Sequence, residues 1–264
     1  MKNQVLSAMT EDTTQAQYLL ADRSIEFLKA FIDKMNYELV ICLGMPRLFE
    51  EINTCKGEVF LFDIDDRFRT FHKNFCQYNM FNNHFFSSTE NLNFKAALSN
   101  LSKPRVLIIT DPPYAGLVDV FIDSYKCFTR DWNLNPDLIW IFPYFHERQI
   151  SLRLPSVKMI NYIVSYDNHK KFQNNLNGHN SSPVRIFTNV EQNLFDFDSE
   201  KNNEYCKECK LHVFKGASHC SLCEKCYGWS GKTFNHCFKC GKCFKSTWKH
   251  CTKCGKCQPT YHKC

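Results

Sequence analysis

Four residues that could carry chemistry, Asp111-Pro112-Pro113-Tyr114, follow directly after the apolar run RVLIIT at 105–110. A proline pair stiffens a turn and removes two backbone donors, so nearby carbonyl oxygens stay free to accept hydrogen bonds. If the Asp111 carboxylate and the Pro112 carbonyl accept the N–H groups of an exocyclic amine, the nitrogen lone pair is directed at an electrophilic methyl group. The Tyr114 ring can stack on the base that carries the amine, a contact of about 1–3 kcal/mol in stacking systems. The motif therefore predicts methyl transfer to a base outside a duplex.

Two earlier apolar runs also end in residues that suit a ligand. Gly44 ends ELVICLG at 38–44, and a glycine lets a ligand approach the backbone closely. Asp63 lies 19 residues further on, near the end of FLFDID, where nucleotide-binding sheets hold a pair of ribose hydroxyls. The alternatives are a plain turn at Gly44, a helix cap at Asp63, and a strand that merely ends in prolines before Tyr114. Taken together, these positions favour a site for an adenosine-bearing cofactor.

Cysteine and histidine dominate the C-terminal region. Three copies of His-Cys-x2-Cys-x2-Cys, at 219–226, 236–243 and 250–257, are preceded by CKEC at 206–209 and followed by HKC at 262–264. Twelve cysteines and four histidines make 16 ligands, enough for four tetrahedral zinc sites of three cysteines and one histidine each. A segment so short and so poor in aliphatic residues cannot fold by core burial, and we expect zinc to supply its folding free energy.

One interleaved pairing of these ligands fits all of the spacings. It combines Cys206, Cys209, His219 and Cys226; Cys220, Cys223, His236 and Cys243; Cys237, Cys240, His250 and Cys257; and Cys251, Cys254, His262 and Cys264. A sequential pairing is the alternative, and the spacing does not exclude it. His212 is left over, and we expect it on the surface.

Composition divides the chain at the same place. Four of the 16 cysteines are scattered through the first 200 residues and twelve lie in 206–264, which without a signal peptide favours metal over disulfides. Residues 201–264 hold 13 lysines, no arginine and three glutamates, a formal charge of +10, whereas residues 1–200 have a formal charge of −4. The polar segment at 195–205 marks the boundary between predicted domains 1–200 and 201–264.

No apolar run approaches the ~20 residues needed to span a bilayer, so we expect a soluble intracellular protein.

The first domain alternates short apolar runs with segments that can form helices. Strands are predicted at 38–44, 58–65, 105–110 and 137–142, helices at 89–101 and 115–128, and late antiparallel edge strands at 157–167 and 183–190. This alternation predicts an α/β fold with a mostly parallel sheet and helices on both faces. Ligands bind such sheets at the carboxyl ends of the strands, which is where Gly44, Asp63 and Asp111 lie.

The order of the motifs resembles that of a known family. The pattern D/N/S-P-P-Y/F after the fourth strand is typical of amino-methyltransferases that act on adenine N6. The segments QYLL, ICLGMPRLFE, FLFDID, YNMFNNHFF, TDPPYAGLV, WIFPYF, YDNH and SPVRIFTN occur in the order seen in the zinc finger CCHC domain-containing protein 4 family. This resemblance covers roughly residues 15–264. It implies a class I (Rossmann-like) methyltransferase domain that uses S-adenosylmethionine to make N6-methyladenosine in large-subunit ribosomal RNA.

The resemblance also implies roles for individual residues. The methionine end of the cofactor would be lined by Gln17, Tyr18, Leu19 and Leu20. Arg47 would approach the cofactor carboxylate and Asp63 its ribose, with Gly44 at the neighbouring strand end. The adenine of the cofactor would contact Asn79, Met80 and Phe81. The catalytic loop would consist of Asp111, Pro112, Pro113 and Tyr114, with Asp111 also next to the cofactor.

The expected partner is ribosomal RNA whose target adenine is single-stranded or flipped out, and no membrane is expected. Lysines interleaved with Trp229, Phe238, Phe244 and Trp248 suit phosphate contact and base stacking, while a structural module packed on the body is the alternative. Members of the family carry zinc fingers ahead of the catalytic domain, which we expect this chain to lack because its motifs begin close to Met1. We therefore expect a ribosome-assembly factor or a helicase to help present the RNA, in the nucleus, nucleolus and cytoplasm.

Three other functions compete with this interpretation. Interleaved Cys-His blocks also resemble the DHHC module of protein palmitoyltransferases, but the sequence has neither transmembrane segments nor a D-H-H-C run. A non-enzymatic zinc-dependent RNA-binding protein with an inactive methyltransferase fold is disfavoured by the intact motif at 111–114 and by Asp63. The last is a methyltransferase for another nucleic acid or for an amide. Amide methyltransferases usually have asparagine where this chain has Asp111, which favours adenine.

Overall fold

The computed structural model describes residues 18–52, 56–70, 73–114, 117–168, 182–197, 200, 203–228 and 233–264. The chain divides into two compact units, the larger of which ends with Ser182–Phe195, while Asp196–Cys264 belongs to the smaller. This division lies within the polar segment at 195–205.

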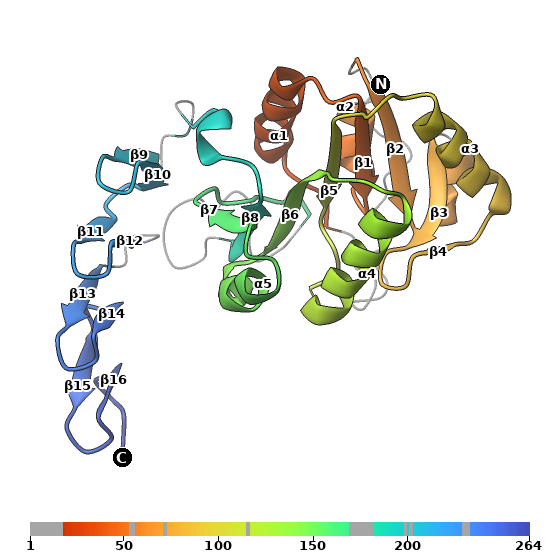
Figure 1. Ribbon diagram of the computed structural model, residues 1–264. Helices are drawn as coiled ribbons and strands as arrows, with labels where there is room; N and C mark the ends of the chain where they lie inside the picture. Colours follow the sequence, from red (N-terminus) through yellow and green to blue (C-terminus); the bar gives the residue numbers. More distant parts are fainter. Residues whose placement is uncertain are drawn as a thin grey trace. The chain divides into compact units, whose positions relative to one another are not determined.

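The larger unit is built on one mixed sheet, to which the described residues contribute eight strands (Figure 1). Their order across the sheet is β4-β3-β2-β1-β5-β6-β8-β7. The strands are β1 (Leu39–Leu43), β2 (Glu58–Asp63), β3 (Phe75–Asn79), β4 (His84–Phe85), β5 (Val106–Thr110), β6 (Asp137–Pro143), β7 (Lys158–Ile160) and β8 (Val184–Thr188). Strands β1, β2, β3, β5 and β6 run parallel, whereas β4 and β8 are antiparallel to their neighbours. The predicted α/β fold is confirmed.

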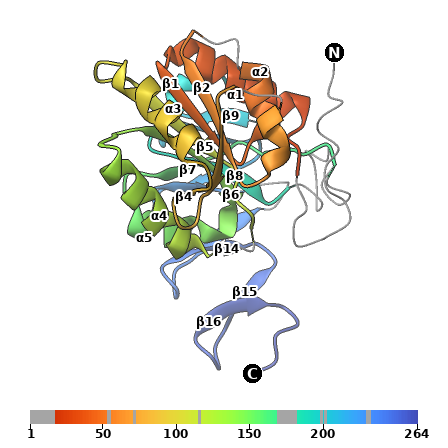
Figure 2. The same ribbon diagram turned by 90° about the vertical axis from the view of Figure 1, so that its right-hand side faces the viewer.

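Helices cover both faces of this sheet, with α1 and α2 on one face and α3 and α4 on the other (Figure 2). The α-helices are α1 (Asp22–Met35), α2 (Pro46–Ile52), α3 (Ser88–Ser99), α4 (Val118–Asp131) and α5 (Glu147–Arg153). Short 3₁₀ segments are η1 (Asp66–Thr70), η2 (Tyr144–His146) and η3 (Gln192–Leu194). Helices α3, α4 and α5 pack on an aromatic-rich core that includes Phe62, Phe94, Phe128 and Trp140. No helix in the described part of the chain is long and apolar enough to cross a membrane.

Helix α1 shows how the local sequence forms these elements. Its buried residues Ile25, Leu28, Ile32 and Met35 recur at helical spacing and form one apolar face. The helix ends at Asn36, whose φ of 49° is left-handed, as is common just past a helix. Full burial of each large apolar side chain contributes about 1.5–3 kcal/mol, so this face anchors the helix.

The late strands differ from their prediction in extent and place. The segment predicted at 157–167 is a strand only in β7, and beyond it Tyr166 pairs with Leu20 instead. Strand β8 pairs with both β6 and β7, so it lies inside the sheet and not at its edge. All five of its residues are buried, which suits an interior strand.

The smaller unit consists of four consecutive antiparallel hairpins in its described residues (Figure 1). Their strands are β9 (Asn203–Cys206), β10 (Leu211–Phe214), β11 (Ser218–Cys220), β12 (Lys225–Tyr227), β13 (Phe234–Cys237), β14 (Lys242–Lys245), β15 (Trp248–Cys251) and β16 (Lys256–Pro259). The described apolar side chains that are buried here are Phe197, Val213, Phe214 and Cys257. So small an apolar core cannot stabilise four hairpins, and another source of folding free energy is required.

Candidate active site and metal centres

The register of the central strands positions the candidate active site. Leu43 in β1 lies opposite Phe62 in β2 and Thr110 in β5. The residues that come next in each strand therefore emerge side by side at the carboxyl edge of the sheet: Gly44, Asp63 and Asp111.

Gly44 lets three chain segments meet at this edge. Its φ is +71°, which side chains rarely adopt, and its amide donates to the Phe62 carbonyl at 2.8 Å. A Cβ at this position would lie 2.9 Å from Cε of Met80 and 3.8 Å from the carbonyl oxygen of Asp111. Close approach to the backbone is thus a property of this turn, as the sequence indicates.

Asp63 is a buried acid, and one of its carboxylate oxygens accepts a backbone hydrogen bond. Its side chain is 7% exposed, and its Oδ1 accepts the Asp65 amide at 2.9 Å. Burial raises the pKa of Asp63 to about 7, although the hydrogen bonds from the Asp65 and Ile64 amides oppose that rise. Asp63 therefore holds the turn that leads to η1, whereas the acceptor directly before η1 is Asp65, whose Oδ1 accepts the Arg67 amide at 3.1 Å.

The turn after β3 supplies apolar surface next to Gly44. The Asn79 side chain accepts the Phe81 amide at 3.0 Å and so folds the chain back over the sheet edge. Met80 and Phe81 are partly buried against the core, and the Phe81 ring packs edge-on against Phe121 at 6.5 Å. This turn offers a surface on which a flat ring can pack.

Asp111 is surrounded by tyrosine hydroxyls. Tyr166 donates to Oδ2 of Asp111 at 2.9 Å, and the Tyr166 and Tyr114 hydroxyls are themselves hydrogen-bonded. Burial raises the pKa of Asp111 to about 7, and the tyrosine hydrogen bonds oppose that rise because they favour the carboxylate. Within the loop, Pro112 is buried and Pro113 is exposed.

The tyrosine rings form a cluster beside this carboxylate. The Tyr18 and Tyr114 rings are inclined by 14° with centroids 6.4 Å apart, and Tyr166 meets Tyr18 edge-on at 6.0 Å. Phe142 supports the Tyr114 ring edge-on from the end of β6, at 5.7 Å. Sequence reasoning did not assign Tyr166 to the site, although the YDNH segment that starts with it was among the family motifs.

The segment before α1 is held in place by the segment around Tyr166. Leu20 forms a β-bridge with Tyr166, the Leu19 amide donates to the Asn168 side chain at 2.8 Å, and the Asp167 amide donates to the Leu19 carbonyl at 2.9 Å. These contacts bring Tyr18, Leu19 and Leu20 to the active-site edge. Gln17, the fourth predicted residue of this group, lies outside the described residues.

Arg47 is tied into an ion-pair network. It donates to the Leu20 carbonyl and to the Asp167 carboxylate, and its Nη2 lies 2.5 Å from Oδ1 of Asp22. The side chain is 14% exposed, and no described residue accepts a hydrogen bond from its buried Nε. The network fixes the entry to α1, and the contact of Arg47 with a cofactor carboxylate stays a prediction.

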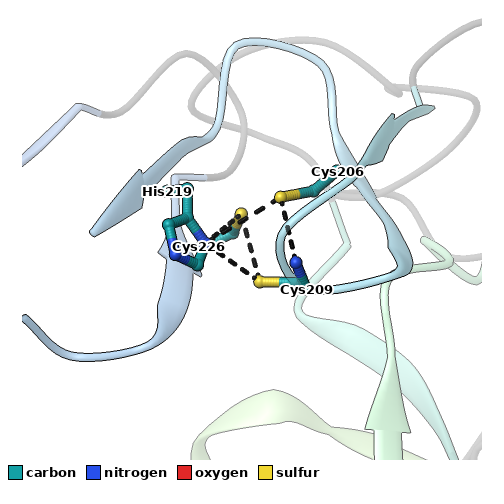
Figure 3. A group of neighbouring side chains, drawn as sticks. All are labelled: Cys206, Cys209, His219 and Cys226. Atoms are coloured by element: carbon teal, nitrogen blue, oxygen red, sulfur yellow. Dashed lines mark hydrogen bonds between the residues drawn. The ribbon is translucent and has the colours of Figure 1, made fainter. Parts of the chain in front are cut away.

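The cysteines and histidines of the smaller unit gather into four groups, one of which is drawn in Figure 3. The groups follow the interleaved arrangement: Cys206, Cys209, His219 and Cys226; Cys220, Cys223, His236 and Cys243; Cys237, Cys240, His250 and Cys257; and Cys251, Cys254, His262 and Cys264. Within each group all ligand atoms lie within 4.8 Å of one another. His212 is outside these groups, and its ring stacks on Phe197 at 5.0 Å.

The spacing of the ligand atoms in the first three groups is close to that of a tetrahedral metal site, whereas Sγ of Cys251 and Sγ of Cys264 in the fourth are closer together, at 3.1 Å. Zinc bonds of about 2.3 Å to sulfur and about 2.0 Å to nitrogen place neighbouring ligand atoms roughly 3.5–3.8 Å apart. The Sγ atoms of Cys209 and Cys226 are 3.6 Å apart, and those of Cys223 and Cys243 are 3.8 Å apart. The first three groups use the histidine Nδ1, whereas His262 of the fourth uses Nε2, 3.5 Å from Cys254.

Each of the first three groups joins two successive hairpins. In the first, Cys206 and Cys209 lie at the turn of the β9–β10 hairpin, whereas His219 and Cys226 are cross-strand partners in β11 and β12. The next two groups repeat this pattern one hairpin further on. The residue after each turn's second cysteine has a φ of 50–65°, and these residues are Lys210, Glu224, Gly241 and Gly255. A metal in each group would link the hairpins into one chain.

Comparisons with known proteins agree with this geometry. A family described as probable N6-adenine methyltransferase matches residues 11–192. The chain is similar to "rRNA N(6)-adenosine-methyltransferase ZCCHC4" of Homo sapiens, with 37% identity over 249 residues, which is 87% of this chain and 48% of that protein. The Mus musculus protein of that name is 38% identical over 236 residues, 83% of this chain and 46% of that protein. The chain thus spans about half the length of the curated relatives it matches.

Proposed function

Because the chain belongs to the probable N6-adenine methyltransferase family, we propose that it methylates N6 of an adenine in large-subunit ribosomal RNA, with S-adenosylmethionine as methyl donor. The observation that carries this proposal is the position of Asp111, which directly follows β5 beside Gly44 and Asp63 with an aromatic ring in the same loop. The names of the relatives support ribosomal RNA as the substrate.

The residues at the sheet edge fit an adenosine cofactor. Asp63 has an oxygen for the ribose hydroxyls, Gly44 leaves room for a ligand against the backbone, and Met80 and Phe81 offer a surface for the adenine. The segment at 18–20 lies on the same edge, where it would hold the methionine end. When bound, S-adenosylmethionine supplies an electrophilic methyl group on a positively charged sulfur.

The catalytic loop would hold the target amine. Oδ2 of Asp111 accepts the Tyr166 hydroxyl, so Oδ1 can accept one N–H of the amine while the Pro112 carbonyl accepts the other. These two hydrogen bonds aim the nitrogen lone pair, and the Tyr114 ring stacks on the base. No side chain needs to deprotonate the neutral amine first. The N–C bond would form as the bond between the methyl carbon and the cofactor sulfur breaks, and the methylated amine would then release its extra proton to solvent.

The carboxylate of Asp63 should contribute to cofactor affinity. Asp63→Ala removes a charged hydrogen-bond acceptor, and we expect S-adenosylmethionine to bind about 1.5–3 kcal/mol more weakly. Titration calorimetry measures this, with Asp66→Ala as the control because Asp66 is exposed in the same turn. Unchanged affinity in Asp63→Ala would mean that Asp63 only stabilises the turn. Asp65 would then be the next acid to test for a contact with the cofactor.

The turnover should rise with pH near neutrality. The pKa of Asp111 is about 7, and only the carboxylate can accept both the tyrosine and the amine hydrogen bonds, so kcat/KM for RNA should increase as pH rises through 7. Tyr166→Phe removes a hydrogen bond that favours the carboxylate, so the ascending limb should move to higher pH. The assay uses saturating S-adenosylmethionine, so that protonation of Asp63, which is assigned to cofactor binding, does not alter the measured dependence of kcat/KM on pH.

The control for this prediction is Tyr162→Phe. Tyr162 is a buried tyrosine whose hydroxyl donates to the Arg23 carbonyl at 3.3 Å, outside the cluster around Asp111. Its profile should match that of the parent. If Tyr166→Phe also left the ascending limb in place, Tyr166 would not act through Asp111.

The substrate class is tested by methyl transfer to different nucleic acids. Labelled S-adenosylmethionine is incubated with the protein and purified large-subunit RNA, small-subunit RNA or DNA, and we expect label in large-subunit RNA. Label confined to DNA would favour an adenine methyltransferase for another nucleic acid. Failure to label any of them, with RNA still bound, would favour the non-enzymatic RNA-binding alternative.

We further propose that each of the four groups in the smaller unit holds one zinc ion. Their donor sets of three cysteines and one histidine suit structural zinc.

We also propose that the protein meets its RNA in the nucleus, nucleolus and cytoplasm, with a ribosome-assembly factor or a helicase as partner. This follows from the proposed substrate, because large ribosomal subunits begin assembly in the nucleolus and complete it in the cytoplasm.

A further inference from the structure

A pocket of about 370 Å³ lies within the smaller unit, between the β11–β12 hairpin and the β13–β14 hairpin. Its described lining includes Leu222, Tyr227, Phe234, Asn235 and Phe238. Pockets for small ligands start at about 300 Å³, so the space suits a single ring system and not a folded element. Neither the candidate active site nor the metal groups explain why apolar side chains surround it.

The walls of this pocket are flat and partly exposed. The Tyr227 and Phe234 rings are inclined by 29° with centroids 5.9 Å apart. Phe238 is 83% exposed at the tip of one hairpin, and Leu222 is 61% exposed at the equivalent tip of the other. Large apolar side chains held in water beside a pocket often mark a binding site, and aromatic walls favour a planar ligand.

Polar groups and charge indicate an anionic partner. Asn235 offers both a hydrogen-bond donor and an acceptor at the pocket. From Lys225 to the C-terminal Cys264 the sequence has nine lysines and no acidic residue. Lys239 follows Phe238 directly, and Lys242 lies opposite Cys237 in the same hairpin.

We propose that this pocket binds one unpaired base of a single-stranded RNA, with the neighbouring lysines at its phosphates. Base stacking on aromatic side chains and a basic track along the backbone are the two contacts that single-stranded nucleic acids require. A nucleobase is planar and has donors and acceptors at its edge for Asn235. That the RNA is the methylation substrate rests on the proposed function, but the pocket itself does not.

The second metal group links the two walls of the pocket. Cys220 and Cys223 come from the first hairpin, and His236 and Cys243 from the second. Three of these four donors also line the pocket, so a metal there would fix the distance between its walls. Tests of the pocket therefore require the zinc-loaded protein.

The test compares two exposed aromatic residues of the same unit. Phe238 is 83% exposed at the pocket, and Tyr261 is 85% exposed away from its lining, so neither replacement removes core packing. Phe238→Ala should weaken binding of a fluorescent single-stranded RNA by about 5- to 100-fold, whereas Tyr261→Ala should change it less than about twofold. Phe238→Trp should restore binding, and zinc content should match the parent in all three proteins.

Salt dependence separates stacking from charge. Phe238→Ala removes no charge and should leave the slope of affinity against salt unchanged, whereas Lys239→Ala should flatten it by about one phosphate contact. A second readout is photo-crosslinking of a 4-thiouridine oligonucleotide, which should label Tyr227 or Phe238. Equal affinity in Phe238→Ala and the parent, or adducts found only elsewhere, would overturn the proposal. The proposal would also be overturned if Phe238→Ala bound RNA as the parent does but no longer bound a protein partner that the parent binds.

The outcome is independent of the methylation result. If Phe238→Ala weakens RNA binding but the parent transfers no methyl group, the pocket stands and the proposed activity fails. If the parent methylates RNA and Phe238→Ala binds RNA normally, the activity stands and the pocket proposal fails.

Discussion

Asp111→Ala is expected to lower methyl transfer by about 10²–10³-fold, the effect typical of removing one group that is positioned for the transition state. The carboxylate is half-buried at the sheet edge, and its Oδ1 is the atom assigned to the target amine. Cofactor affinity should weaken only modestly, because that binding is assigned mainly to Asp63 and its neighbours. Single-turnover rates at saturating S-adenosylmethionine measure the effect, and a rate within about threefold of the parent would remove Asp111 from the mechanism.

Substitutions at Tyr114 provide the matched comparison. Tyr114→Ala removes the ring face and should fail as Asp111→Ala does. Tyr114→Phe should remain active, because the ring persists and Tyr166 still donates to Asp111 at 2.9 Å. Inactivity of Tyr114→Phe would instead assign the catalytic contribution to the Tyr114 hydroxyl.

Zinc content is expected to be four ions per chain, and Cys240→Ser is expected to remove more than one of them. Cys240 belongs to the third group, with His250 and Cys257 from the next hairpin. Structural zinc contributes on the order of 10–16 kcal/mol in zinc-finger peptides, far more than the few buried side chains of this unit. Loss of the third ion should therefore also release the hairpins that the second and fourth groups hold.

Elemental analysis of natively purified protein gives the zinc count, and amide exchange shows which hairpins loosen. Cys127→Ser is the control, since Cys127 is a partly buried cysteine of α4 outside the four groups and should cost no zinc. A parent count of two or fewer would end the four-site model. Loss of a single ion, with both neighbouring hairpins still protected, would show that the groups fold independently.

The sequence predicts those features that depend on local spacing. Strand β5 and the loop at 111–114 follow from an apolar run that stops at prolines, and Gly44 and Asp63 follow from their places at strand ends. The metal groups can also be predicted from local spacing, because the distances between the Cys-His blocks allow the interleaved arrangement. Choosing it over sequential pairing requires the strand register, in which His219 faces Cys226.

Features that depend on distant contacts were not predicted. Tyr166 lies 55 residues after Asp111 along the chain, and only the fold brings its hydroxyl to that carboxylate. Arg47 meets Asp22 and Asp167 for the same reason, so its ion pairs cannot be inferred from local pattern. The interior place of β8 also depends on pairing, because a buried run of five residues does not identify its neighbours.

The protein is expected to deliver the methyl group to N6 of adenine in large-subunit ribosomal RNA. The most direct measurement is nucleoside analysis of that RNA after incubation with labelled S-adenosylmethionine and either the parent or Asp111→Ala. We expect label in N6-methyladenosine with the parent and a loss of about 10²–10³-fold with the variant. Label in another nucleoside, or equal N6-methyladenosine from both proteins, would contradict the account.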